Sequence, residues 1–97
     1  MIEEMRLKSM LQNLTSNEYQ YFENSVQFFV DQGEESITPL LTNLKRNSDD
    51  PIAIANTLYT FGRMGEAAKR AVPMILPYIK HTNYEIRTSA IGALGKI

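Results

Sequence analysis

Few residues in this chain could catalyse a reaction or hold a metal ion. His81 is the single histidine, it lies between Lys80 and Thr82 in an expected turn, and the sequence contains no cysteine. A general base needs a partner within hydrogen-bond reach, and a zinc site needs about three protein ligands drawn from histidine, cysteine and carboxylate side chains. We therefore expect His81 to be a solvated turn residue. We predict no catalytic residue, no metal site and no cofactor.

The acidic pair and the glycines have structural explanations. Asp49 and Asp50 precede Pro51, which is the pattern of a helix N-cap followed by proline in the first turn. The glycines of the second half do not form the G-x-x-x-x-G-K-[ST] string that cradles phosphates. We expect them to end helices or to permit close packing, and they lie at positions 62, 65, 92 and 95.

Charge is unevenly distributed along a chain whose net charge is −1. Residues 1–33 contain five acidic and two basic residues, whereas residues 66–97 contain five basic and two acidic residues. Phosphate binding needs clustered Lys and Arg, but Lys69 and Arg70 fall on a different expected helix from Arg87 and Lys96. Nucleic-acid binding is therefore kept only as an alternative function.

The N-terminus does not resemble a signal peptide. Glu3 and Glu4 stand where a signal peptide carries positive charge, and no apolar run approaches the roughly 20 residues that span a bilayer. We expect a soluble, cytoplasmic protein.

Apolar spacing predicts six helical segments and no strand. The first is expected at residues 2–13, and the second follows a capping box at 15–18 and extends to residue 32. The third is expected at 36–47, and the fourth begins at 51 and ends between 62 and 65. The fifth is expected at 67–80 with a bend at Pro73, and the sixth follows a second capping box at 82–85 and extends to 97. Gly33 should end the second helix. Because the connections are short, consecutive helices should pack antiparallel.

The second, fourth and sixth helices repeat one another with offsets of 32 and 33 residues. A row of small residues runs beside a row of large ones: Ser25, Thr57 and Ala90, then Phe29, Phe61 and Leu94. A small row lets neighbouring helices approach, and a large row fills the space beside it. Tetratricopeptide repeats would require a tryptophan that is absent, and ankyrin repeats would require T-P-L-H-x-A, of which only Thr38-Pro39-Leu40 is present.

The last two repeats resemble the short HEAT-like repeats of the bilin-lyase type. Their recurring string is roughly D-P-x-V-R-x-x-A-A-x-A-L-G-x-I-G, and it is matched by Ile86-Arg87, Ala90, Ala93-Leu94-Gly95 and Ile97. Asp50-Pro51, Gly62 and Gly65 match in the middle repeat, while Ile54 stands where the family has arginine. The resemblance covers residues 33–97 well and residues 1–32 only in pattern.

This resemblance implies an all-α domain over residues 1–97, an α-α superhelix (solenoid) of about three HEAT-like helix pairs. The pairs would occupy residues 1–32, 33–64 and 65–97, and the array is either complete or a fragment of a longer one. The resemblance also implies that Arg87 braces one repeat against its neighbour's turn, and that the second helix of each pair lines a concave face.

We predict that such a chain is a non-catalytic scaffold that binds a protein partner on the concave face. Tyr59 and Arg63 lie one turn apart and are of the types enriched at interface hot spots. The predicted partner-binding residues are Asn24, Gln27, Asn56, Tyr59, Arg63 and Lys96. The alternative functions are a subunit of a bilin-lyase-type enzyme and a nucleic-acid-binding HEAT-like protein. The alternative role of Tyr59 is structural, with its side chain half-packed into a groove.

The C-terminal helix carries more apolar residues than one buried stripe requires. Ile86, Ile91, Leu94 and Ile97 are spread around it, so we expect part of this surface to stay exposed. The sequence therefore predicts weak self-association through the last helix, promoted by salt because the last third of the chain is basic.

Overall fold

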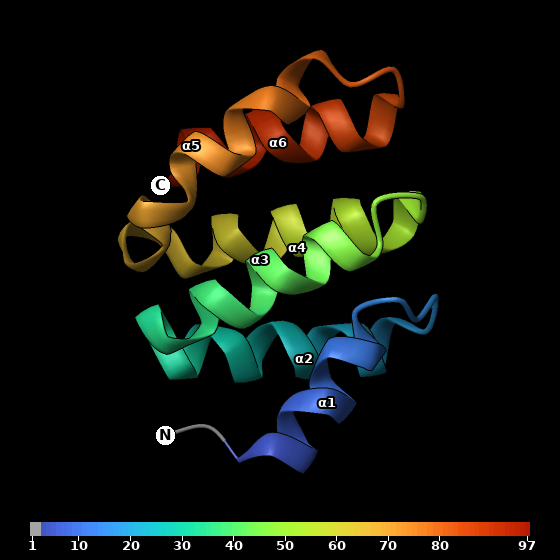
Figure 1. Cartoon of the computed structure of the whole chain (residues 1–97), viewed down its shortest axis with the longest axis vertical. Helices are drawn as coiled ribbons and strands as arrows, with labels where there is room; N and C mark the ends of the chain where they lie inside the picture. The colour runs from blue at the N-terminus through green and yellow to red at the C-terminus, as the bar shows by residue number, and fades with distance from the viewer. Residues whose placement is uncertain (1–2) are drawn as a thin grey trace.

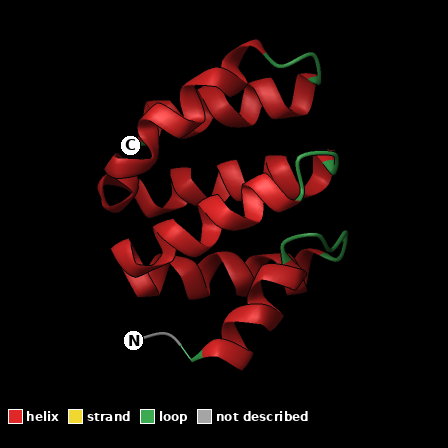
Figure 2. Cartoon of the chain, viewed as in Figure 1, coloured by secondary structure: helices red, strands yellow, loops and turns green. Residues whose placement is uncertain are grey.

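A computed structural model describes residues 3–97, and within that range all regular secondary structure is helical, with no strand (Figures 1 and 2). Its principal dimensions are 34 × 26 × 22 Å. No helix in the described range is long and apolar enough to span a bilayer. The all-α class expected from the sequence is therefore confirmed.

The first two helices form where the apolar spacing places them, but the second helix does not begin with the cap that was predicted. Helix α1 spans Glu4–Asn13, and the expected start at Ile2 lies outside the described residues. Helix α2 spans Tyr19–Gln32 and is preceded by Glu18 in extended conformation, with no side-chain cap. The capping box at 15–18 is thus wrong, because the Thr15 hydroxyl donates backward to the Gln12 carbonyl oxygen.

The middle pair follows the sequence prediction closely. Helix α3 spans Ile37–Arg46, and helix α4 spans Pro51–Met64. Asp50 caps α4, since one carboxylate oxygen accepts hydrogen bonds from the amides of Ile52 (3.1 Å) and Ala53 (3.2 Å). This cap satisfies amide groups that lack partners in the first turn, as expected from Asp before Pro.

The fifth segment differs from the single bent helix expected at 67–80. It consists of a 3₁₀ helix, η2 (Gly65–Ala71), one α-helical turn, α5 (Val72–Ile75), and a second 3₁₀ helix, η3 (Leu76–Lys80). Both Pro73 and Pro77 lack the amide that would bond four residues back, so a regular α-helix cannot continue through them. The bend predicted at Pro73 is therefore only one part of a more extensive interruption.

The last helix, α6, spans Tyr84–Lys96, and its cap lies one residue later than predicted. Asn83 Oδ1 accepts a hydrogen bond from the Ile86 amide at 3.1 Å, so Asn83 and not Thr82 is the N-cap. Asparagine caps helices at least as well as threonine, and Asn83 lies one residue nearer the helix.

Two equivalent turns repeat the same backbone geometry. Gly33 ends α2 with φ 65° and ψ −138°, and Gly65 ends α4 with φ 61° and ψ −135°. These are the only described residues with positive φ, and each begins a 3₁₀ helix, η1 (Gly33–Ser36) or η2. Only glycine adopts this conformation without strain, so the sequence repeat at this position is also a structural repeat.

The helices form two rows (Figure 1). Helices α2, α4 and α6 lie one above another, with α4 packed against both α2 and α6, while α1, α3 and α5 cross in front of them. The loops that precede α2, α4 and α6 lie on one side of the molecule (Figure 2). The small row and most of the large row are buried between these elements: Ser25, Thr57, Ala90, Phe29 and Phe61 are all 0% exposed.

Gly62 marks the closest approach between α4 and α6. A Cβ atom placed on Gly62 would lie 3.1 Å from the Cα atom of Ala93. Gly92, in α6, has no neighbouring atom within 4 Å of the equivalent position. A residue without a side chain is therefore needed at position 62, where the backbones of α4 and α6 approach each other.

Two positions of α6 are exposed although the equivalent positions of α4 are buried. Ile91 corresponds to Leu58 and Gly95 to Gly62 at an offset of 33 residues. Leu58 is 0% exposed, whereas Ile91 is 59% exposed and Gly95 has open space around it. Ile86 is fully buried, so only part of the expected apolar surface reaches solvent.

Replacing Gly62 by alanine should destabilise the chain by about 1–3 kcal/mol, because backbone atoms must move to admit the methyl group. Replacing Gly92 by alanine should instead be neutral or stabilise it by up to about 1 kcal/mol, because alanine favours the helix. Urea unfolding followed by circular dichroism measures both. An equal response of the two variants would contradict the close approach of α4 and α6.

Exposure of Ile91 should produce weak self-association, stronger at high salt. Ile91→Lys should abolish it, whereas Ile52→Lys should leave it unchanged, because Ile52 is also exposed (39%) but lies at the start of α4. Sedimentation velocity at low and high salt makes the comparison. A strict monomer at high concentration in both buffers would rule out this contact.

Candidate functional site

Helix α4 reaches solvent through one narrow stripe. After Ile52, every residue of the helix is buried except Asn56, Tyr59 and Arg63. These three lie at positions i, i+3 and i+7, so they share one face of the helix. All three were predicted to bind a partner, and we call them, with the side chains they contact, the α4 stripe.

Tyr59 occupies the centre of the stripe and is half-buried. Its ring packs against Phe22 of α2, with centroids 5.5 Å apart and planes inclined at 43°. Its hydroxyl oxygen accepts a hydrogen bond from Arg63 Nη1 at 3.2 Å. The ring thus packs in the groove between α2 and α4, as the half-packed alternative expected, and the residue remains partly exposed.

Arg63 forms an ion pair across two helices. Its Nη1 lies 2.8 Å from Glu23 Oε1 of α2, and the two side chains are 31% and 28% exposed. Its Nη2 reaches Gln27 Oε1 at 3.5 Å. The hydrogen bond that Arg63 donates to Glu23, followed by the one it donates to Tyr59, raises the pKa of Arg63 above its ordinary value. The guanidinium is therefore permanently charged and held in one position.

A second cation approaches the same ring from α6. Lys96 Nζ lies 5.9 Å from the Tyr59 ring centroid, and the Arg63 guanidinium carbon lies at the same distance. A cation within about 6 Å of an aromatic centroid is attracted to the ring. Because Lys96 is exposed, its ammonium group can also contact a partner beside Tyr59.

Four of the six predicted partner-binding residues meet in this way: Gln27, Tyr59, Arg63 and Lys96. Two contacting residues, Glu23 and Phe22, were missed. Glu23 lies 40 positions from Arg63 and off the repeat offset, so no spacing in the sequence indicates this pair. Phe22 is an apolar residue, and only its contact with the Tyr59 ring in the folded chain places it at the stripe.

Asn56 and Asn24 have different surroundings. Asn56 Nδ2 donates to the carbonyl oxygen of Leu14 at 2.6 Å, which ties the end of α1 to α4. Asn24 is exposed and lines a cleft between α1 and α2 together with Arg6 and Phe28. Asn56 thus belongs to the stripe although its amide makes an internal contact, and Asn24 lies apart from the Tyr59 cluster.

Arg87 braces a turn, but within its own helix pair. Its Nη1 donates to the carbonyl oxygens of His81 (3.1 Å) and Thr82 (3.0 Å), in the loop that leads into α6. The neighbour's turn, which the family resemblance implied, is not its partner. The loop lies five and six residues before Arg87, within direct reach of the long side chain.

His81 belongs to the same loop and is not a freely solvated residue. Its Nδ1 accepts a hydrogen bond from the Asn83 amide at 3.0 Å, and its ring stacks on Tyr78 with centroids 6.2 Å apart. Within the described chain, no group of three His, Cys, Asp or Glu side chains could hold a metal ion. The role visible for His81 is to shape the turn.

The α4 stripe offers cationic donors, an aromatic ring and amide groups. It pairs no nucleophile with a general base, which covalent catalysis would require. Its chemistry suits contact with carbonyl or carboxylate oxygens and with apolar side chains.

Alanine substitution of Glu23 and Arg63, singly and together, should reveal a coupling of about 0.5–1 kcal/mol, as measured for partly exposed ion pairs. The coupling should decrease with added salt. Unfolding free energies of the four proteins provide the value, and Arg63→Ala combined with Glu85→Ala is the control for an additive pair. Additive effects of Glu23→Ala and Arg63→Ala would show that their contact does not hold α2 to α4.

No protein-family model matches the chain, and no curated protein matches its sequence.

Proposed function

We propose that the chain is a HEAT-like helical repeat module, an α-α superhelix of three helix pairs, that binds a protein partner on the face of α2, α4 and α6. The observation that carries the proposal is the α4 stripe, in which Tyr59 and Arg63 are fixed by contacts from α2 and α6. In this proposal the chain has no catalytic role of its own.

The repeated geometry supports the architecture. Gly33 and Gly65 have nearly the same backbone angles 32 residues apart, and each joins a long helix to a 3₁₀ turn. Two-helix units of this size cannot bury their apolar faces alone, so they stack on neighbours. A stacked array presents an extended surface made of equivalent helices, which suits recognition of another macromolecule.

Pre-organisation supports the binding role. Long side chains such as arginine lose conformational entropy when a partner immobilises them, and this loss weakens binding. Glu23, Gln27 and the Tyr59 hydroxyl already hold Arg63 in place, so that cost is partly met before the partner arrives. Tyrosine and arginine at the centre of a face are the residue types that most often dominate interface energies.

The charges of the stripe indicate what the partner offers. Glu23 already neutralises Arg63, whereas the Lys96 ammonium lies against the Tyr59 ring. The partner would place an apolar side chain against the exposed part of Tyr59 and an acceptor, either a carbonyl or a carboxylate, near Lys96 and the remaining Arg63 donors.

A Tyr59→Ala/Arg63→Ala double variant should lose its partner, with affinity reduced about tenfold or more, as hot-spot residues require. Tyr21→Ala/Arg70→Ala removes the same residue types from exposed positions elsewhere and should bind as the parent chain does. Quantitative capture from lysate of the expressing cell identifies the partner, and titration of that purified partner gives the affinities. Identical partners at identical affinity for both variants would refute the proposal, and thermal melts confirm that each variant is folded.

A further inference from the structure

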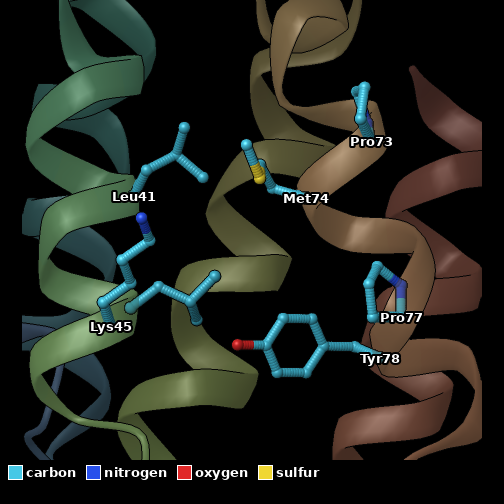
Figure 3. Close-up of a pocket in the computed structure, with 7 residues that line it drawn as sticks. Leu41, Lys45, Pro73, Met74, Pro77 and Tyr78 are labelled. Atoms are coloured by element: carbon cyan, nitrogen blue, oxygen red, sulfur yellow. The ribbon is translucent and has the colours of Figure 1, made fainter.

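A cleft of about 240 Å³ lies on the other row of helices, between α3 and the α5–η3 segment (Figure 3). One wall is formed by Leu41 and Leu44 of α3. The other wall is formed by Pro73, Met74 and Pro77. Both walls are apolar, and Met74 is 49% exposed, so the cleft is open to solvent.

The prolines explain why this space is not filled. Pro73 and Pro77 are four residues apart, so their short rings lie on the same side of the segment. They replace the longer side chains that would otherwise extend toward α3. The same interruption that breaks the fifth segment into short pieces therefore leaves an apolar hollow beside it.

Two polar groups stand at the cleft. Figure 3 shows the Lys45 ammonium group beside Leu41, and the Tyr78 hydroxyl directed from η3 toward α3. Neither group has a hydrogen-bond or ion-pair partner among residues 3–97. A tyrosine hydroxyl is protonated at neutral pH and can donate a hydrogen bond, and burial raises the pKa of Tyr78 further in that direction.

The charge at the cleft is positive. Lys45 is the one charged side chain among the residues that line it. Asp49 and Asp50 are the acidic residues nearest to Lys45 in sequence, and Asp50 is engaged as the cap of α4. The cleft therefore complements an occupant that is apolar at one point and carries a negative charge near Lys45.

We propose that this cleft is a docking site for an acidic peptide segment of a partner protein, which inserts one apolar side chain between α3 and α5. A carboxylate of the segment pairs with Lys45, and the Tyr78 hydroxyl donates to a carbonyl oxygen beside the anchor. The cleft is smaller than the roughly 300–1,000 Å³ of dedicated small-molecule sites, which favours a single side chain of a larger partner. This site is separate from the α4 stripe and does not depend on the function proposed for that stripe.

The probe is a blocked synthetic octapeptide with two central leucines flanked by glutamates, titrated into the ¹⁵N-labelled chain. Amide shifts should change at residues 41–45 and 73–78. One control peptide carries serines in place of the leucines, and another carries lysines in place of the glutamates. Each should bind at least about tenfold more weakly, because one lacks the buried apolar group and the other reverses the charge.

Variants of the chain locate the contact. Lys45→Glu and Met74→Glu should each weaken binding of the acidic peptide by about tenfold. Lys8→Glu makes the same charge change on α1 and should leave the affinity unchanged. Tyr59→Ala/Arg63→Ala should also leave it unchanged, which separates this site from the α4 stripe. Met74 and Lys45 are exposed, so these variants should fold, and their melting curves verify it.

The proposal fails if the acidic peptide shifts no cleft residue at millimolar concentration, or if the serine or lysine peptides bind equally well. It also fails if Lys45→Glu has no effect. Shifts of the same residues on concentrating the chain without peptide would instead identify a second copy as the occupant. Tighter binding of octanoate than of the peptide would identify a free amphiphilic acid.

Discussion

The burial of helix α4 on almost every side is the constraint on which the rest of the structure depends. Nine of its fourteen residues are buried, and they include Leu58 and Phe61, which are completely inaccessible. A helix in this position can be apolar nearly all round, because it packs against α2, α3 and α6 at once. After Ile52, the only residues of α4 that remain partly exposed are Asn56, Tyr59 and Arg63. Each of them contacts a neighbouring helix or its end, so the packing constrains these side chains as well.

That geometry explains why the α4 stripe makes contacts with the end of α1, with α2 and with α6. Asn56 bonds to the end of α1, Arg63 pairs with Glu23 of α2, and Tyr59 receives Lys96 of α6. Under the proposed function, a partner seated on the stripe would contact residues that already hold these helices together. Binding there would therefore oppose the separation of the helices.

The buried hydroxyl groups show how a small residue row is compatible with a dry interior. Ser25 donates to the Met10 carbonyl oxygen, Ser36 to that of Phe29 and Thr57 to that of Ala53. Each hydroxyl satisfies its donor on a nearby backbone, so its burial does not leave an unpaired polar group. Two of these bonds join different elements: Ser25 of the small row ties α2 to α1, and Ser36 ties η1 to α2.

The sequence allowed the helices to be predicted better than their ends. Apolar spacing, Asp50 before Pro51 and Gly33 located most elements to within a few residues, because these signals act locally. Thr15 and Thr82 were misassigned as caps, because several polar side chains compete near each helix start and only the folded loop decides between them. The pairing of Glu23 with Arg63 could not be predicted, since it depends on how α2 lies against α4.

The two candidate surfaces differ in how their charge is used, and this difference bears on their roles. On the α4 stripe, Glu23 pairs with Arg63 and largely neutralises its charge. Arg63 would therefore contribute to binding mainly through its shape and its directed N–H donors. At the cleft, Lys45 has no partner in the described chain and stands beside an apolar hollow. An unpaired exposed charge accelerates encounter with an oppositely charged segment, whereas a pre-organised aromatic and arginine pair lengthens the lifetime of a complex once formed. A module with both surfaces would use the α3–α5 side for rapid capture of an acidic segment and the α4 stripe for sustained binding, and the two would respond differently to salt.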